Sequence, residues 1–258
     1  MRTNSSPVIW SDPPASVGLA AGEVHIWRAF LNCEPSVPSR FESTLSPDER
    51  ARAGRFIFET DRSRFVMARG ILRDLLGGYL LLSPAEIQFC YGNRGKPALD
   101  PKTNSSSLQF NLSHSGDVAL YAFAGRRRVG IDVERFRPEL AGDEIAKRYF
   151  SAKEVDELTA LPAESRTEGF YLCWTRKEAY IKATGDGLQV PLDSFDVSLS
   201  PGQSATLSTR DGIDWGITSF NPTVSPEPRY AAAMVVEGAN YTTRFFRLVK
   251  ENAAWELR

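Results

Sequence analysis

The 258-residue sequence predicts an α+β protein made of two similar halves with pseudo-twofold symmetry. Segments with the alternating apolar pattern of strands lie on both sides of Gly125, and each side also has a long helical segment that ends at glycine. The apolar content of 42% and the charged content of 24% are typical of a globular chain that buries a core. We expect the functional site in the cleft between the halves.

The same segments set the expected boundaries. Residues 1–22, rich in proline, serine and alanine, are expected to form a flexible tail. The N-terminal half is expected over 23–125 and the C-terminal half over 126–240. Residues 241–258 form an extension of unassigned role, with an edge strand expected within 241–249.

Charge and cysteine content exclude several classes of partner. The 31 basic and 32 acidic residues give a net charge of −1, so no global field attracts nucleic acid or an anionic membrane. Cys33, Cys90 and Cys173 are too widely spaced for a disulfide framework or a CxxC metal site, which indicates reduced thiols. No signal-peptide pattern opens the chain, and no run approaches the ~18 apolar residues of a membrane span. We expect a cytoplasmic monomer.

Two helices are predicted early in the N-terminal half. Ser46 can cap the first, and Pro47 suits its first position. Apolar residues at helical spacing predict the second over 61–76, with Gly77-Gly78 as its end. Both helices carry arginines: Arg50, Arg52, Arg55, Arg62, Arg64, Arg69 and Arg73. Their spacing does not separate solvated arginines from members of an anion site.

The remaining N-terminal elements are strands joined by turns. Strands are expected at 24–31, 87–91 and 118–124, with a short helical turn at 83–86. A turn-rich loop presents Lys96 between Gly95 and Pro97. In a further strand, Phe110, Leu112 and His114 point to one face.

Strand 129–134 carries two acidic residues on one face. Alternation places Gly130, Asp132 and Glu134 opposite the apolar positions. Two carboxylates one repeat apart, with space beside small Gly130, would suit a hard cation such as Mg²⁺, which prefers oxygen ligands. A solvated strand edge would show the same pattern, so the segment alone leaves both interpretations open.

The segment 174–188 predicts a helix that stops at Gly185. Helical spacing puts Trp174, Glu178 and Lys182 on one face. Taken alone, Glu178 and Lys182 would be an i,i+4 surface pair worth ~0.3–0.5 kcal/mol. Trp174 fits core packing better than substrate contact.

Further helices and strands complete the C-terminal half. A helix is expected near 143–149, and a capping box at Ser151 opens the next. Strands are expected at 195–199, 215–220 and 230–236.

Five motifs, in this order and spacing, resemble the 4'-phosphopantetheinyl transferases, in the longer, pseudo-dimeric branch typified by surfactin-synthetase-activating enzymes. They are Asp61-x-x-Arg64, Gly95-Lys96-Pro97, Phe110-Asn111-Leu112-Ser113-His114-Ser115, Gly130-Ile131-Asp132-Val133-Glu134 and Trp174-x-x-Lys177-Glu178-Ala179-x-x-Lys182-x-x-Gly185-x-Gly187-Leu188. Each motif alone is weak. Together they cover roughly 24–236 and are specific.

The resemblance implies transfer of 4'-phosphopantetheine from coenzyme A to a serine of an apo acyl or peptidyl carrier protein, with adenosine 3',5'-bisphosphate as the other product. It implies Mg²⁺ held by Asp132, Glu134 and Glu178. Asp132, Glu178 and Lys182 are the implied catalytic residues, with Lys182 beside the pyrophosphate. Glu178, or a water beside it, would take the serine proton.

The resemblance also implies residues for the phosphates of coenzyme A. Lys96, Ser113 and His114 would hold them, and Arg64 is a further candidate. One or more of three arginines on the first helix would join them, and the sequence does not decide among Arg50, Arg52 and Arg55. The candidate surfaces for the carrier protein are 126–128 and 147–150.

Two other functions fit the same residues. A Mg²⁺-dependent hydrolase of coenzyme A or a related pyrophosphate would use water as the nucleophile. A non-catalytic carrier-binding module is the second alternative, and the complete set of Asp132, Glu134, Glu178 and Lys182 argues against it. The sequence does not indicate whether the carrier serves fatty acid, polyketide or nonribosomal peptide synthesis.

Overall fold

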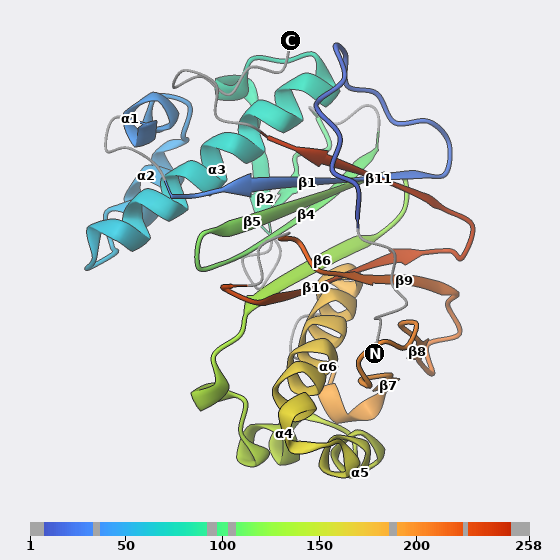
Figure 1. Ribbon diagram of the computed structural model, residues 1–258. Helices are drawn as coiled ribbons and strands as arrows, with labels where there is room; N and C mark the ends of the chain where they lie inside the picture. The colour runs from blue at the N-terminus through green and yellow to red at the C-terminus, as the bar shows by residue number, and fades with distance from the viewer. Residues whose placement is uncertain are drawn as a thin grey trace.

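The computed structural model describes residues 8–32, 37–91, 97–102, 107–185, 190–223 and 227–248. Its two main sheets lie one above the other (Figure 1). The N-terminal sheet has the order β11 (Thr242–Arg247), β1 (Glu23–Phe30), β5 (Val118–Gly125) and β4 (Leu108–Ser115). The C-terminal sheet has the order β6 (Val129–Arg135), β10 (Tyr230–Glu237) and β9 (Trp215–Phe220).

The two halves repeat one topology. Each has a first strand, a 22-residue helix, a small two-stranded sheet, and a hairpin whose last strand pairs with the first. The helices are α3 (Glu59–Leu80) and α6 (Ala163–Thr184). The small sheets are β2 (Phe89–Tyr91) with β3 (Pro97–Leu99), and β7 (Asp196–Val197) with β8 (Leu207–Ser208). The order β1-β5-β4 therefore matches β6-β10-β9, which confirms the prediction of two similar halves.

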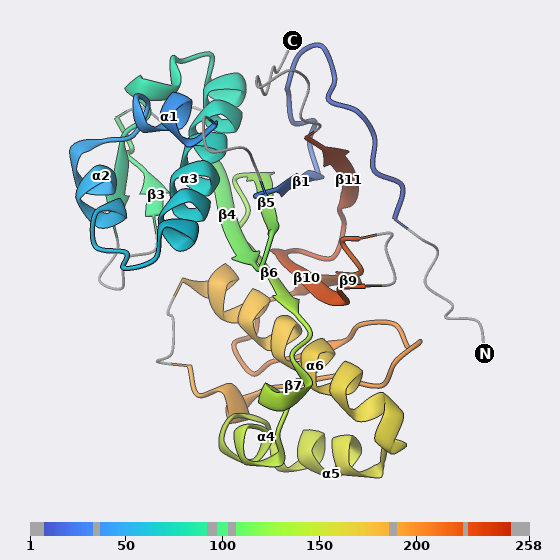
Figure 2. The ribbon, with the colours of Figure 1, turned by 60° about the vertical axis from the view of Figure 1, so that its left-hand side comes forward.

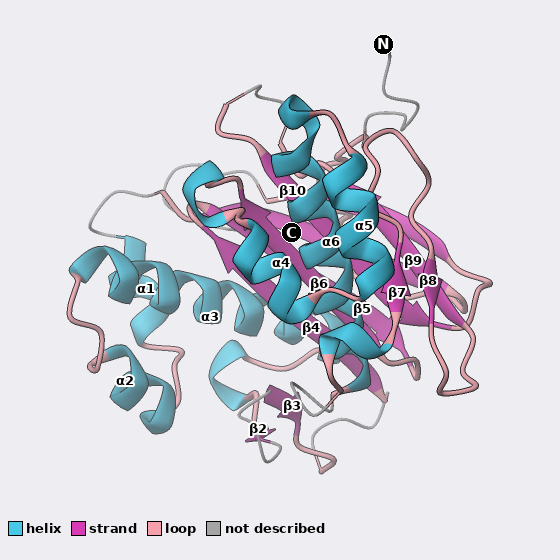
Figure 3. Cartoon of the chain, turned by 90° about the horizontal axis from the view of Figure 1, so that it is seen from below, coloured by secondary structure: helices cyan, strands magenta, loops and turns pink. Residues whose placement is uncertain are grey.

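The shorter helices gather around α3 and α6 (Figure 3). In the N-terminal half they are α1 (Val37–Glu42), α2 (Pro47–Ala53) and η1 (Pro84–Glu86). In the C-terminal half they are η2 (Pro138–Leu140), α4 (Asp143–Tyr149), α5 (Ala152–Ala160) and η4 (Leu192–Ser194). Capping boxes at Ser46 and Ser151 confirm the predicted starts of α2 and α5.

The end of α3 differs from the prediction. The helix continues through Gly77-Gly78 to Leu80, and Leu81 ends it in the left-handed conformation, with φ of 56°. A Cβ at Gly77 would lie only 2.7 Å from the carbonyl oxygen of Leu82. Gly77 thus makes room for the chain that returns over the last turn, and it does not stop the helix.

An apolar core joins the two sheets. Val129, Ile131 and Val133 of β6 are buried there, as the alternation predicted, against Ile26 and Leu120 of the N-terminal sheet. Each half also has its own core beneath its long helix. The acidic face of β6 consequently points away from this shared core.

The first and last segments that the structure describes both contact the N-terminal sheet. The predicted edge strand is β11, which pairs in parallel with β1. Residues 1–7 of the expected flexible tail lie outside the described residues, while further along Trp10 is buried and Ser11 bridges to Phe246. An aromatic side chain at the sheet junction fixes this part of the tail. Within the described residues, every helix is too short or too polar to cross a membrane.

Candidate active site

The acidic face of β6 packs closely against α6. Figure 2 shows β6 between β4 and α6. A Cβ at Gly130 would lie 2.1 Å from the carbonyl oxygen of Ala179. The sequence indicated open space for a cation beside Gly130, and this was wrong because the α6 backbone fills that space. The close approach brings Glu178 to the side of β6 that carries Asp132.

Asp132 is held by a lysine and a serine. The Nζ atom of Lys182 lies 2.6 Å from Asp132 Oδ1 and 3.0 Å from Ser113 Oγ. The Ser113 hydroxyl donates a hydrogen bond of 2.9 Å to the same Asp132 oxygen. Asp132 is only 2% exposed, and its Oδ2 has no hydrogen-bond partner among the described residues. A buried carboxylate oxygen without a partner is costly and marks a place for a further ligand.

Glu134 and Glu178 lie close enough to Asp132 to feel its charge. Burial raises the pKa of both glutamates, and the negative charge of Asp132 raises each pKa further. Lys182 acts on both in the opposite direction. Three carboxylates that share one site require added positive charge to be ionised together.

Asp132, Glu134 and Glu178 do not form a closed set of metal ligands in this structure. In the described part of the chain, no group of three or more histidine, cysteine or acidic residues is placed to hold one. Lys182 supplies the positive charge next to Asp132 instead. The Mg²⁺ site stays a prediction. It fits the raised pKa of both glutamates and the Asp132 oxygen that has no partner in the described ranges.

Alternate residues of β4 contact the open edge of β6. Asn111 Oδ1 accepts a hydrogen bond of 2.9 Å from the backbone N–H of Ile131. Ser113 bonds Asp132, and Ser115 donates a hydrogen bond of 2.7 Å to Glu134 Oε2. His114, between the two serines in the chain, points to the opposite face because strand neighbours alternate.

A cluster of cations surrounds His114. Its ring is partly open to solvent, yet the protein around it lowers the pKa of the imidazole, and Lys182, Arg64, Arg69 and Arg52 lower it further. His114 is therefore neutral and able to donate one ring hydrogen bond to an anion. The four cations supply the local positive charge that the overall composition lacks.

The arginines of this cluster differ in their partners. Arg64 donates a hydrogen bond of 2.6 Å to Asp117. The guanidinium of Arg52 lies 5.4 Å from the centre of the Phe65 ring. Arg50 bonds the carbonyl of Leu45, so its charge serves the fold. Lys96 lies outside the described residues.

Arg69 is one of the arginines named on the second predicted helix, and the family resemblance did not assign it to the site. It is 5% exposed, and its Nη1 has no hydrogen-bond partner among the described residues. Its Nε lies 3.8 Å from Glu49, a contact too long for a hydrogen bond. The signal available in the sequence was its position one helical turn after Phe65, on the buried side of α3. A buried arginine there is costly unless its charge is paired.

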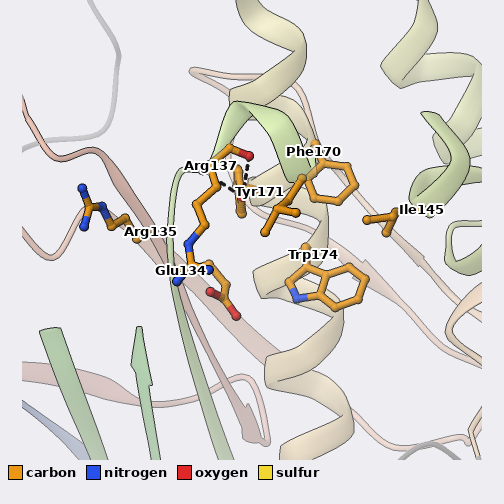
Figure 4. Close-up of a pocket in the computed structure, with 8 residues that line it drawn as sticks. Glu134, Arg135, Arg137, Ile145, Phe170, Tyr171 and Trp174 are labelled. Carbon is orange, nitrogen blue, oxygen red and sulfur yellow. Dashed lines mark hydrogen bonds between the residues drawn. The ribbon is translucent and has the colours of Figure 1, made fainter. Parts of the chain in front are cut away.

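A pocket of about 290 Å³ opens next to Glu134 (Figure 4). Its lining is mainly apolar, with two arginines on one side: Glu134, Arg135, Arg137, Leu140, Ile145, Phe170, Tyr171 and Trp174. The Tyr171 hydroxyl accepts from the backbone N–H of Arg137 and donates to its carbonyl, which fixes that wall. Trp174 packs against Tyr149 as expected and also lines this pocket.

A second pocket, of about 320 Å³, lies beyond Lys182 at the end of α6. Residues of β3, β4 and α6 line it, among them Leu99, Gln109 and Thr184. Along α6 the order is therefore the first pocket, Glu178, Lys182 and the second pocket. A long substrate with a central charged group would fit this order.

The two candidate surfaces for the carrier protein, 126–128 and 147–150, differ in whether their basic side chains are already engaged by other residues of the chain. Arg127 bonds the carbonyl of Asn240, and Arg128 forms a 3.0 Å ion pair with Glu237, so these arginines serve the C-terminal sheet. Lys147 and Arg148 are exposed on α4. The same helix supplies Ile145 to the first pocket, so the structure favours this surface.

Comparison with known proteins identifies the family. Residues 128–235 match the model of the 4'-phosphopantetheinyl transferase superfamily, and residues 35–125 match that of the 4'-phosphopantetheinyl transferase N-terminal region. The 4'-phosphopantetheinyl transferase HetI of Nostoc sp. is 40% identical over 237 residues, 92% of this chain and 97% of that protein.

Two further relatives agree. The 4'-phosphopantetheinyl transferase Sfp of Bacillus subtilis is 36% identical, over 62% of this chain and 69% of Sfp. The human L-aminoadipate-semialdehyde dehydrogenase-phosphopantetheinyl transferase is 31% identical, over 67% of this chain and 60% of that protein. With both halves matched and a relative aligned over nearly its whole length, the chain belongs to the 4'-phosphopantetheinyl transferase superfamily.

Proposed function

We propose that the chain transfers the 4'-phosphopantetheine arm of coenzyme A to a serine of an apo acyl or peptidyl carrier protein and releases adenosine 3',5'-bisphosphate. The observation that carries this proposal is the meeting of Asp132, Glu134, Glu178 and Lys182 at the junction of the halves. Attack of a serine oxygen on the β-phosphorus requires neutralisation of the phosphoryl oxygens. A carboxylate and lysine set beside a cation cluster suits this requirement.

Mg²⁺ would be held by Asp132, Glu134 and Glu178, as the family resemblance implies. Two observations support this ligand set: Asp132 Oδ2 has no hydrogen-bond partner among the residues described, and the pKa of both glutamates is raised. When bound, Mg²⁺ supplies charge neutralisation at the pyrophosphate oxygens.

Lys182 and Glu178 have separate roles in the proposed transfer. The Lys182 ammonium, which contacts Asp132 in this structure, would donate hydrogen bonds to the pyrophosphate and to the leaving bisphosphate. Glu178, or a water next to it, takes the proton of the attacking serine. Its raised pKa makes Glu178 a better proton acceptor than an exposed glutamate.

The cation cluster would hold the phosphates of coenzyme A. His114, Arg52 and Arg64 keep the roles that the resemblance implies, and Lys96 remains a candidate from the neighbouring loop. We add Arg69, whose buried Nη1 has no hydrogen-bond partner in the part of the chain that the structure describes. Ser113 contacts this cluster through Lys182, whose Nζ donates a 3.0 Å hydrogen bond to the Ser113 hydroxyl.

The pocket of Figure 4 would receive the pantetheine arm next to the carrier serine. Its apolar wall suits the arm, and Lys147 and Arg148 on adjacent α4 suit an acidic carrier surface. Because one chain supplies both sides of the site, we infer that a monomer is sufficient. Cys90 and Cys173, free thiols among the described residues, fit a cytoplasmic location.

The deciding experiment incubates the chain with coenzyme A, Mg²⁺ and a panel of apo carrier proteins. Intact-mass spectrometry should show one carrier gaining one phosphopantetheine. Glu178→Gln should abolish the gain, while Glu164→Gln, on the exposed start of the same helix, should not. Release of bisphosphate without carrier modification would favour the hydrolase, and a fully active Glu178→Gln variant would contradict the proposed site.

A further inference from the structure

Ser115 lies where the β4–β5 hairpin of the N-terminal half meets β6. It is 7% exposed, and its hydroxyl donates a 2.7 Å hydrogen bond to Glu134 Oε2. The Ser115 hydroxyl oxygen in turn accepts a 3.1 Å hydrogen bond from the backbone N–H of Arg135. Because that N–H engages the hydroxyl oxygen, the single hydroxyl proton is directed at Glu134.

The hairpin that carries Ser115 is fixed on two sides. Gly116 has φ of 55°, and a Cβ there would lie 2.9 Å from the Tyr230 hydroxyl of β10. On the other side, Asp117 accepts a 2.6 Å hydrogen bond from Arg64 of α3. The hydroxyl of Ser115 is therefore placed by the fold, and it does not reach Glu134 by side-chain flexibility.

Ser113 and Ser115 each bond one oxygen of an acidic side chain on β6. Ser113 and Lys182 both bond Asp132 Oδ1, and Oδ2 is left without a partner among the described residues. Ser115 bonds Glu134 Oε2, and no hydrogen bond joins Oε1 to any described residue. In both acids a β4 serine holds one oxygen and leaves the other for a ligand.

We propose that Ser115 is a positioning residue that orients Glu134 for cation binding. This inference rests on the proposed function, which supplies the cation. Hydrogen-bond partners of metal-binding carboxylates typically change metal affinity by 10- to 100-fold. Ser115 would thus make the N-terminal half a determinant of cation affinity, although the carboxylates lie in the C-terminal half.

The test compares Ser115→Ala with the wild-type chain by calorimetric titration with MgCl₂. We expect about tenfold weaker Mg²⁺ binding in Ser115→Ala. In the carrier assay, half-saturating Mg²⁺ should rise by a similar factor, with little change in the rate at saturating Mg²⁺. Ser115→Thr, which keeps the hydroxyl, should restore the affinity. Ser194→Ala, at an exposed serine whose hydroxyl bonds the Pro191 carbonyl, is the control.

A purely structural role for Ser115 would give a different result. The rate at saturating Mg²⁺ would fall, or Mg²⁺ affinity would equal that of the wild-type chain, and either result overturns the inference. If the wild-type chain modifies carriers and Ser115→Ala binds Mg²⁺ as tightly as the wild-type chain, only the positioning role is rejected. A wild-type chain that binds Mg²⁺ but modifies no carrier rejects the transferase proposal, and the affinities still decide the role of Ser115. Absence of Mg²⁺ binding by the wild-type chain rejects the inference together with the proposed cation site.

Discussion

Lys182 neutralises a buried carboxylate before any substrate arrives. Asp132 is 2% exposed, and the lysine ammonium lies 2.6 Å from it. A buried charge without a counter-charge is strongly unfavourable. The residue that would later contact the pyrophosphate therefore also stabilises the substrate-free fold. Its two roles are separable, because one depends on substrate and the other does not.

Replacing Lys182 tests both roles. Lys182→Met should destabilise the metal-free chain by about 1–3 kcal/mol, since the lysine is partly exposed and only part of the buried-pair penalty applies. Carrier modification should fall by about 100-fold or more, because the leaving group loses its charged donor. Chemical denaturation and the mass assay measure the two effects. Unchanged stability would show that Asp132 finds another counter-charge.

Asp74 on α3 is a carboxylate that burial disfavours. Its contact with Arg40 is 3.3 Å long, and burial raises the pKa of Asp74 to about 6 despite that arginine. The folded chain therefore binds a proton more tightly than the unfolded chain. Stability from this residue is highest at low pH and falls as pH rises from about 4 to about 6.

Asp74→Asn should consequently raise stability at neutral pH. We expect a gain of about 1–2 kcal/mol at pH 7.5, which shrinks toward zero near pH 4 as the wild-type carboxyl becomes protonated. Urea denaturation at several pH values measures the difference. Asp156→Asn, at an exposed position on α5, is the control. A gain that does not vary with pH would contradict the raised pKa.

At the scale of elements, α6 carries one side of the site and is anchored beneath it. Lys177 is 1% exposed, and its Nζ lies 2.7 Å from Glu154 and bonds the carbonyls of Leu192 and Phe195. Its neighbour Glu178 faces the site. Helical geometry separates adjacent residues by about 100°, so one turn serves both core and site.

Gly130 sets the distance between α6 and β6. In Gly130→Ala the new Cβ would meet backbone atoms of Ala179 and Ala183, so the helix must move. We expect a loss of about 1–3 kcal/mol in stability and a larger loss of activity, because Glu178 and Lys182 move with the helix. Gly125→Ala, where nothing lies within 4 Å, should have little effect. Equal behaviour of the two variants would contradict this role for Gly130.

The elements of this fold are largely predictable because their signals are local. Capping boxes, alternation on β6 and the Gly185 stop each depend on a few neighbouring residues. The end of α3 was missed because Gly77 is required by the close approach of the returning chain at Leu82. Sequence signals for helix ends do not include such a tertiary contact. The space assigned to Gly130 was wrong for a similar reason, since only the packed structure places α6 there.

At the scale of the whole molecule, the halves are held by a shared core and by the N-terminal segment. Trp10 lies between them, with Arg28 of β1 at 4.4 Å from its ring, Phe245 of β11 at 5.3 Å and Phe220 of β9 at 6.2 Å. One tryptophan thus contacts both sheets. Trp10 therefore helps to hold the two sheets together, and it contributes to the site only through this junction.

Trp10→Ala should weaken the junction. We expect a loss of about 2–4 kcal/mol in unfolding free energy. Both halves should be affected, because Trp10 packs against both sheets. Thermal unfolding followed by circular dichroism measures the loss. Ile9→Ala, at a position 83% exposed, should change little. A Trp10→Ala variant as stable as Ile9→Ala would show that the junction does not depend on this contact.

The site was only partly predictable from sequence. Its acidic residues and Lys182 follow from motif order, because their spacing on one strand and one helix is local. The bonds from Ser113 and Ser115 to the carboxylates require knowing that β4 lies beside β6. That contact spans the two halves, and no pattern within either half contains it.

The contact between β4 and β6 has one more consequence, for solubility. β6 is an edge strand of its sheet, and an open edge with apolar residues is a template for pairing with another chain. Asn111 and Ser115 occupy its N–H groups at Ile131 and Arg135, so an incoming strand cannot bond these groups. The polar side chains that prepare the site therefore also guard this edge against aggregation.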